Sequence, residues 1–417
     1  MLKQILKPWK LISLALVLLV FFSLYGFIYS QIMKLPSDNW SNPILIDEYD
    51  SKWDLKIMNT NNTLALPIQN DSFININAKG NLITISQFNK MGELENRNEI
   101  ESSNSISEIR GEVIKDKCFL TTYSEVEEII QFITLDNSNF NVINTVSYPT
   151  NGQKVKLSNK HVTAFNETSI QIIKPSGIKA ITKDIKGRII FADSLIIGEE
   201  IYILPIYNDM SYCKLGYMYT NDNQNLNDYI YELSSSSSLK PVNIEMNRAG
   251  NNVEVLITMK DFKFGDSYLD QFYLDKSSNL ISYDRYEVES YEAIPYIIDN
   301  NGTKEYLMSL DKPSMGRTEI SKKDKVYPNF YITSNIKEGN FKQLTKSEIT
   351  SRKPSYFKLG EYNYLIHNEQ ADDINRVYLS SANPTIIQAS QKANFTILTD
   401  VFFRTLVNYP ALLFTCG

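Results

Sequence analysis

The chain has 417 residues with 42 basic and 48 acidic side chains, so its formal net charge is −6. Hydrophobic residues make up 43% of the chain and charged residues 22%, a composition typical of globular proteins. No basic patch stands out, which argues against nucleic acid as a partner. The abundance of Asn, Ile and Lys is typical of an AT-rich genome and indicates a bacterial source.

The first predicted element is a charge-free run, Leu11–Tyr29, which follows Lys3, Lys7 and Lys10. As a helix this run would be about 28 Å long, close to the roughly 30 Å hydrocarbon core of a bilayer. Basic residues tend to remain on the cytoplasmic side of a membrane. We therefore predict a cytoplasmic tail over residues 1–10, a transmembrane anchor in the cell membrane over 11–29, and an extracytoplasmic location for the remainder.

A cleaved signal peptide is the alternative to an anchor. Cleavage requires small residues at positions −3 and −1 of the site, and a cut after Ser30 would place Ile28 at position −3. No cysteine lies near the end of the run to carry a lipid anchor. The sequence favours an uncleaved anchor, followed by a juxtamembrane linker over residues 30–55.

The region from residue 56 to residue 390 contains recurring short apolar or alternating runs, which are rich in β-branched and aromatic residues. Examples lie at 63–68, 73–76, 82–86, 129–135, 141–146, 201–207 and 253–259. Clusters of Asn, Asp, Gly, Ser and Pro separate them. Short strands bounded by turn residues are typical of an all-β sandwich, barrel or propeller. The sequence therefore predicts an all-β extracytoplasmic domain over residues 56–390.

Seven units of strands and turns can be aligned within this domain. Their first strands are expected to start near Leu64, Cys118, His161, Ile201, Val253, Tyr306 and Tyr362. The mean interval is roughly 50 residues, close to the size of a four-stranded propeller blade. We predict a six- to eight-bladed β-propeller, with two or more β-sandwich or mixed domains as the alternative. In architecture the chain resembles the degenerate extracytoplasmic β-propellers of bacterial membrane-anchored proteins.

The final segment, residues 391–417, departs from the strand pattern. It is apolar and compatible with a helix, and Phe395, Leu398, Phe402 and Leu406 recur at helical spacing on one face. Charged residues within it disfavour a single spanning helix. Three interpretations remain open: an interfacial helix that contacts the lipid bilayer, the opening of a membrane domain that continues beyond the sequence, or a helix packed on the β domain.

Catalytic and metal-binding motifs are absent from the sequence. It contains no GxSxG, HExxH or P-loop pattern, and its two histidines, His161 and His367, are far apart. Cys118 and Cys213 either pair or remain buried thiols, and the second interpretation is favoured because free cysteine behaves as a small hydrophobic residue. We predict a protein that is not an enzyme, with no cofactor and no metal.

Tyrosine-rich strands are the remaining candidates for a binding surface, because tyrosine is enriched at interfaces. The candidate residues are Tyr202, Tyr207, Tyr217, Tyr219, Tyr283 and Tyr286. The alternative, which the sequence favours, is that these tyrosines pack between blades.

The sequence favours a membrane-tethered extracytoplasmic binding domain whose partner is a membrane or cell-envelope protein or polymer. One alternative is the outer domain of a larger membrane complex, such as a transporter or exporter component. A third is an extracellular carbohydrate-active or hydrolytic propeller enzyme that uses carboxylates and tyrosines in a central funnel.

Overall fold

The structure of the chain is a computed structural model that divides into two compact units, residues 45–379 and residues 1–44 with 380–417. It describes residues 39–50, 63–68, 71–181, 187–209, 212–221, 223–234, 236, 238–263, 266–275, 279–288, 293–300, 303–310, 329–345, 351–371 and 374–393, together with Leu19, Ser23 and Gly26. The larger unit carries the sheets that position the candidate site.

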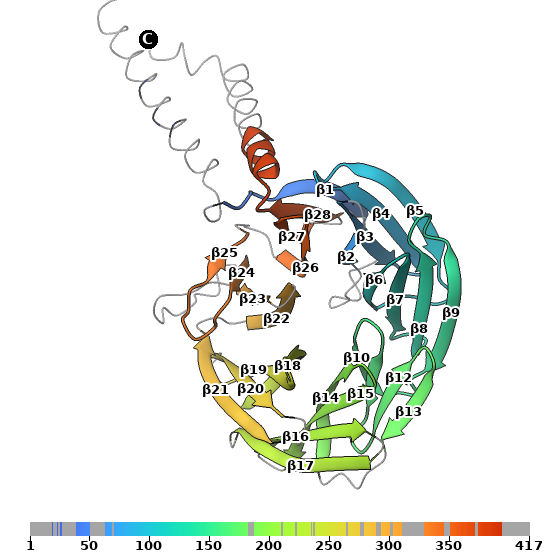
Figure 1. Cartoon of the computed structure of the whole chain (residues 1–417), viewed down its shortest axis with the longest axis vertical. Helices are drawn as coiled ribbons and strands as arrows, with labels where there is room; N and C mark the ends of the chain where they lie inside the picture. The colour runs from blue at the N-terminus through green and yellow to red at the C-terminus, as the bar shows by residue number, and fades with distance from the viewer. Residues whose placement is uncertain are drawn as a thin grey trace, which may run out of the picture. The chain divides into compact units, whose positions relative to one another are not determined.

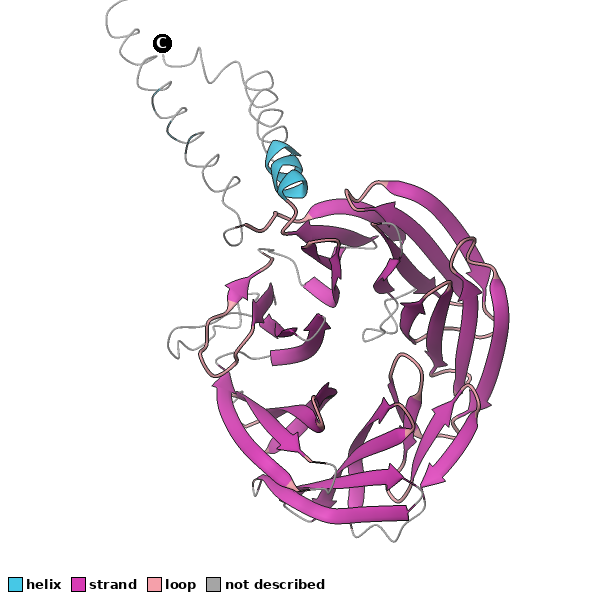
Figure 2. Ribbon diagram, in the orientation of Figure 1, coloured by secondary structure: helices cyan, strands magenta, loops and turns pink. Residues whose placement is uncertain are grey.

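The described residues form seven four-stranded sheets, which are the blades of a seven-bladed β-propeller (Figure 1 and Figure 2). Blade 1 consists of β2 (Thr63–Ile68), β3 (Ser72–Lys79), β4 (Leu82–Asn89) and β5 (Leu94–Glu101). Blade 2 consists of β6 (Glu108–Ile114), β7 (Lys117–Ser124), β8 (Ile129–Asp136) and β9 (Val142–Pro149). Blade 3 consists of β10 (Lys154–Leu157), β11 (Val162–Phe165), β12 (Ile170–Lys174) and β13 (Gly177–Ile181).

The next three blades follow the same order along the chain. Blade 4 consists of β14 (Arg188–Ile197), β15 (Glu200–Asp209), β16 (Tyr212–Asn221) and β17 (Asn223–Ser234). Blade 5 consists of β18 (Leu239–Ala249), β19 (Asn252–Asp261), β20 (Ser267–Leu274) and β21 (Leu280–Val288). Blade 6 consists of β22 (Ala293–Asn300), β23 (Thr303–Leu310), β24 (Asn329–Thr333) and β25 (Lys342–Gln343).

Blade 7 combines strands from the two ends of the propeller sequence. Its order is β1 (Ile44–Asp50), β28 (Ile374–Ser381), β27 (Tyr362–Ala371) and β26 (Ser351–Leu359). Residues 44–50 were expected to lie in the juxtamembrane linker, and they form a blade strand instead. The difference arises because β1 pairs with a strand more than three hundred residues away, and such pairing leaves no local signal in the sequence.

Each of the first six blades is an antiparallel meander in which consecutive strands pair. Most connections are short, but in blade 6 residues 311–328 separate β23 from β24. Between β3 and β4 the register pairs Lys79 with Leu82, which leaves a two-residue turn. Gly80 occupies the first turn position with φ 59°, a conformation that glycine adopts without a steric cost. In Figure 1 the first strand of a blade lies toward the centre of the ring and the fourth lies along its rim.

The core lies between blades, where apolar faces of neighbouring sheets meet. Side chains of blades 1 and 2 form one such cluster, which includes Ile76, Ile85, Leu120 and Phe140. Equivalent clusters join blades 2 and 3, blades 3 and 4, blades 4 and 5, and blades 5 and 6. Aromatic contacts join blades 6 and 7 through Phe330 and His367, and blades 7 and 1 through Phe357 and Phe73.

The seven blades observed lie within the predicted range of six to eight. The predicted starts of the blades, however, are shifted along the sequence. Leu64 lies in the first strand of blade 1, whereas the other six predicted starts lie at the second strand of blades 2 to 7. Second strands are buried almost throughout, as β3 and β19 show. Their apolar residues therefore give the stronger sequence signal, and the more polar innermost strands were assigned to the preceding unit.

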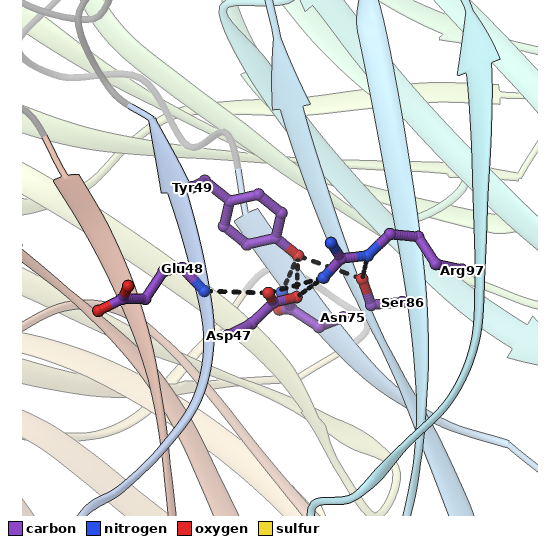
Figure 3. Close-up of polar contacts among 6 residues, drawn as sticks. All are labelled: Asp47, Glu48, Tyr49, Asn75, Ser86 and Arg97. Carbon is purple, nitrogen blue, oxygen red and sulfur yellow. Dashed lines mark hydrogen bonds and ion pairs between the residues drawn. The ribbon is translucent and has the colours of Figure 1, made fainter.

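A polar cluster joins β1 to blade 1 (Figure 3). Nη2 of Arg97 on β5 donates to both carboxylate oxygens of Asp47, at 2.7 and 2.6 Å. The hydroxyl of Tyr49 donates to Asp47 at 2.7 Å and accepts from Asn75 Nδ2 at 3.2 Å. Arg97 Nε also donates to Ser86 Oγ at 3.1 Å. These contacts, which we call the closure cluster, attach the first strand of the chain to the neighbouring blade.

In the smaller unit, residues 384–393 form a helix. Residues 384–390 of it were expected to belong to the β domain, whereas the remaining three lie in the segment for which a helix was predicted. Asn383 caps this helix, because its Oδ1 accepts from the amide of Thr385 at 3.0 Å and Pro384 follows at the first helical position. No described helix is long and apolar enough to cross a membrane. Of the run from Leu11 to Tyr29 only three residues are described, so the predicted anchor lies outside the described residues.

Removing the positive charge of Arg97 should destabilise the closed ring. We expect Arg97→Gln to lower the free energy of unfolding by about 1–2 kcal/mol, because Asp47 loses a charge-assisted hydrogen bond. Asp47 is only 8% exposed, whereas both partners of the Lys90–Asp71 pair are 53% exposed. The matched variant Lys90→Gln should therefore change stability by less than about 0.5 kcal/mol. Thermal unfolding of the full chain measures both, and equal effects would contradict a role in closure.

Candidate functional site

The innermost strands of five consecutive blades place charged and polar residues around the axis of the propeller. They are Arg110 on β6, Lys156 on β10, Asp193 on β14, Glu245 on β18 and Tyr296 on β22. Each is paired in register with a residue of its blade's second strand, as Asp193 is with Leu204 and Glu245 with Leu256. We call these five residues the axial cluster.

A pocket of about 830 Å³ opens beside the axial cluster. Strands and turns of blades 2 to 5 line it, with Arg110, Lys156, Lys160, Lys174, Asp193 and Glu245 among the lining residues. It lies on the propeller face that carries the turns between first and second strands and between third and fourth strands. Its volume falls within the range of roughly 300–1,000 Å³ that small-molecule sites occupy.

Lys156 is the central cation of the cluster. Its ammonium group donates to the Ile244 carbonyl at 3.1 Å and lies 3.5 Å from Glu245 Oε1. Burial alone would lower the pKa of Lys156, but the carboxylates of Glu245 and Asp193 raise it overall. Lys156 therefore remains charged, and it connects blade 3 to blade 5 across the axis.

Asp193 is the most deeply buried acid of the cluster, with only 4% of its surface exposed. Burial raises its pKa to about 7, although Lys156 opposes the rise. The amide of Ser194 donates to Asp193 Oδ1 at 2.7 Å. His161 Nε2 donates to the Ser194 carbonyl at 3.0 Å, and Thr163 and Ser194 share a hydroxyl hydrogen bond of 2.6 Å. Blade 3 thus fixes the strand that presents Asp193.

Arg110 on blade 2 and Tyr296 on blade 6 complete the cluster. Arg110 Nε lies 3.8 Å from Glu108. Burial raises the pKa of Tyr296 to about 12, with Arg110 opposing the rise and Glu245 adding to it.

The strand carrying Arg110 packs closely against its neighbour at Gly111, where an added Cβ would lie 2.6 Å from the Phe119 carbonyl oxygen. Glycine at this position permits the close approach of β6 and β7.

The predicted tyrosine surface is described only in part. Tyr202 and Tyr207 are 1% and 2% exposed and pack in clusters between blades 4 and 5 and between blades 3 and 4. The side chains of Tyr217 and Tyr219 lie outside the described residues, as do Phe395, Leu398, Phe402 and Leu406. Their proposed contacts with a partner and with a membrane stay predictions.

Tyr283 and Tyr286 are partly buried, and both hydroxyls are bonded within blade 5. Tyr283 donates to Asp270 at 3.1 Å and Tyr286 donates to Gln271 at 3.1 Å. Asp270 also binds Arg285, whose Nη2 reaches the Leu233 carbonyl of blade 4 at 2.8 Å. Tyr283 therefore belongs to a polar network that reaches blade 4 through Arg285.

Cys118 and Cys213 are buried and unpaired. His161 and His367 lie in blades 3 and 7 and do not share a site. In the described part of the chain, no group of three or more His, Cys, Asp or Glu residues is arranged to hold a metal ion.

None of the five axial residues was selected from the sequence. The signal that could have found one of them is the acidic residue in the middle of the apolar strand RIIFADSLII, because Asp193 is the only charged residue of that strand apart from Arg188 at its first position. Lys156 and Glu245 gave no such signal, because their strands already contain other charged residues. Only the circular arrangement of the blades brings these residues together.

Comparison of the sequence with protein-family models and with curated proteins found no match. Among solved structures, the β-propeller domain of the trilobed protease from Pyrococcus furiosus matches with a TM-score of 0.42 and 9% identity, over 76% of this chain and 92% of that one. The WD40 domain of Toxoplasma gondii coronin matches with a TM-score of 0.44 and 10% identity, over 82% of this chain and 88% of that one.

Two larger proteins are also similar in structure. The Saccharomyces cerevisiae core factor has a TM-score of 0.47 and 12% identity over 81% of this chain, and a Trypanosoma rangeli sialidase has 0.41 and 7% over 80%. The matches span 60% and 55% of those chains. All of these TM-scores are below 0.5, and the seven blades follow from the seven four-stranded sheets of this chain alone.

The buried Asp193 carboxyl predicts a pH-dependent stability. Its folded pKa of about 7 exceeds the unfolded value of about 3.9, so the folded protein holds this proton more tightly, and stability falls as the pH rises from 4 to above 7. Asn imitates the protonated acid. We expect Asp193→Asn to gain stability relative to the natural chain, by up to a few kcal/mol, between pH 5 and pH 8.

Melting temperatures of the full chain at each pH measure this difference. The control is Asp116→Asn in the exposed β6–β7 turn, which measures what the same exchange does at the surface. A constant difference for Asp193→Asn would show that the carboxyl does not titrate in this range.

Proposed function

We propose that the chain is a membrane-tethered, extracytoplasmic binding domain that takes its ligand in the axial pocket. The observation that carries this proposal is the convergence of charged residues from four different blades on one pocket. Removing charges from water is costly, and apolar residues of similar size would serve a purely structural role at least as well. Perturbed ionisable residues beside a concave site are typical of binding and catalytic sites.

The tether and its orientation are supported by the Leu11–Tyr29 run and the three lysines that precede it. A domain held at the outer surface of a bacterial membrane would meet envelope polymers, secreted molecules and the outer parts of membrane proteins. We therefore infer that the ligand belongs to the envelope or to a membrane partner. An outer domain of a transporter or exporter component would use the same pocket in the same location.

A second candidate function, hydrolysis of an extracellular glycan, is favoured by the environment of Asp193. A buried carboxyl with a pKa of about 7 can donate a proton at neutral pH, and glycosidases combine such an acid with a second carboxylate. Glu245, which faces the same pocket, is the candidate for that partner. Turnover of a glycan by the full chain, lost in Asp193→Asn, would favour this function over binding alone.

Blocking the pocket mouth should abolish ligand binding. Ser176 is an exposed residue of the β12–β13 turn that lines the pocket, and Ser176→Trp places a large ring there. Ser138→Trp, in the corresponding exposed β8–β9 turn outside the pocket, is the matched control. We expect at least one probe among muropeptides, glycerol phosphate oligomers, oligosaccharides and short peptides to raise the melting temperature of the full chain. At a probe concentration of one hundred times Kd, binding should stabilise the folded state by about 2.7 kcal/mol.

That shift should disappear in Ser176→Trp and persist in Ser138→Trp. If the shift persisted in Ser176→Trp, the ligand would bind elsewhere. If no probe shifted the natural chain, the proposed binding function would lose its support.

The topology can be tested independently of the ligand. We expect protease treatment of intact cells to remove the propeller while the amino-terminal segment remains in the membrane fraction. An epitope at the amino terminus, followed by immunoblotting before and after lysis, measures this. Protection of the propeller until lysis, or recovery of full-length protein in the medium, would contradict the proposed tether.

A further inference from the structure

The four cations that line the axial pocket differ in how their charge is compensated. Lys160 lies 2.6 Å from Glu112 and Lys156 lies 3.5 Å from Glu245. Lys174, by contrast, forms no ion pair or hydrogen bond with any residue that the structure describes. Arg110 has only the 3.8 Å approach to Glu108. Two of the four cations therefore have no closely bound anion in the described part of the chain.

Two buried N–H donors beside Lys156 also have no acceptor. They are Arg110 Nε and Asn243 Nδ2, which form no hydrogen bond within the described ranges. Asn243 is close to Lys156, because its Oδ1 accepts from the lysine at 3.4 Å, and Arg110 influences the same lysine electrostatically. Leaving a buried donor unpaired costs free energy. Because Arg110 lines the pocket, a ligand that supplies an oxygen acceptor there would remove its part of this cost.

We propose that the axial pocket binds an oxyanion, carried as a phosphate, sulfate or carboxylate group, with Arg110 and Lys174 as its cationic contacts. This inference rests on the proposed binding function and specifies the ligand class for the same pocket. Lysine and arginine both bind such groups, and charge-assisted hydrogen bonds are the stronger class.

The charges that face Asp193 determine how binding depends on pH. Lys156 faces it from β10, Glu245 from β18, and Arg110 from β6, with Glu108 beside Arg110. His161 bonds to the neighbouring Ser194 carbonyl and its pKa is lowered to about 4 by burial, so it stays neutral. The pKa of Asp193 is about 7, so lowering the pH from 8 to 6 neutralises this acid and makes the pocket more positive.

Sulfate is the probe for the first experiment, because its charge does not change between pH 6 and 8. We expect sulfate to bind the full chain in detergent micelles about tenfold more tightly at pH 6 than at pH 8, as measured by calorimetry. Arg110→Gln and Lys174→Gln should each weaken binding at pH 6 about tenfold. Asp193→Asn should bind at pH 8 as tightly as the natural chain does at pH 6. Lys90→Gln, a cation outside the pocket, should change nothing.

Glycerol 3-phosphate and glucuronate then distinguish a phosphate from a carboxylate as the natural group, since the tighter one identifies it. If Arg110→Gln fails to fold, Lys174→Gln still tests the contact, because Lys174 is only partly buried. Sulfate binding that does not depend on pH or on either cation would overturn the inference.

The inference and the proposed function can fail separately. A neutral probe whose binding is lost in Ser176→Trp, with no binding of the three anions, would overturn the oxyanion inference and keep the binding function. No binding of any probe would overturn both.

Discussion

The structure depends on the contact between the faces of neighbouring blades. A four-stranded sheet has two apolar faces, and it can cover neither of them by folding alone. In this chain the faces are covered only by the next sheet, as the shared cluster of Ile76, Ile85 and Leu120 shows. A linear row of such sheets would leave one face exposed at each end. The ring removes both ends, so its closure by β1 is a condition for burying the whole core.

The candidate site follows from the same arrangement. Where blades meet around an axis, their innermost strands converge and provide side chains from several parts of the sequence. The chain uses these positions for charged residues, although an apolar plug would be less costly. Lys156 illustrates the result, because it contacts blade 5 through Glu245 and lies in the electrostatic field of Asp193 from blade 4. Charged groups are therefore buried at the axis of the propeller, and hydrophobic groups are buried at the interfaces between blades.

The sequence predicted the all-β class and a range of blade numbers that includes seven, because buried second strands such as β19 are strongly apolar. The polar strands could not be predicted from the sequence in the same way. The innermost strand KVKL of blade 3 has little hydrophobic signal, so the sequence does not indicate that Lys156 lies in a strand at the axis. The strand ILIDEYD was assigned to a linker for a related reason, since its hydrogen-bonding partner lies at the other end of the propeller. Long-range pairing and convergence on an axis are properties of the closed ring and have no local sequence pattern.

The position of β1 also affects how the chain can be made. A ribosome synthesises Ile44–Asp50 before any blade, yet the neighbouring strand Ile374–Ser381 emerges more than three hundred residues later. At about 5–20 residues per second, this delay is roughly 15–60 s. During that time β1 lacks its strand partner β28 and blade 1 lacks blade 7 as a neighbour, which makes nascent chains vulnerable to wrong pairing and to aggregation. The native pairing of β1 can therefore form only after β28, the last strand of the propeller, has been translated.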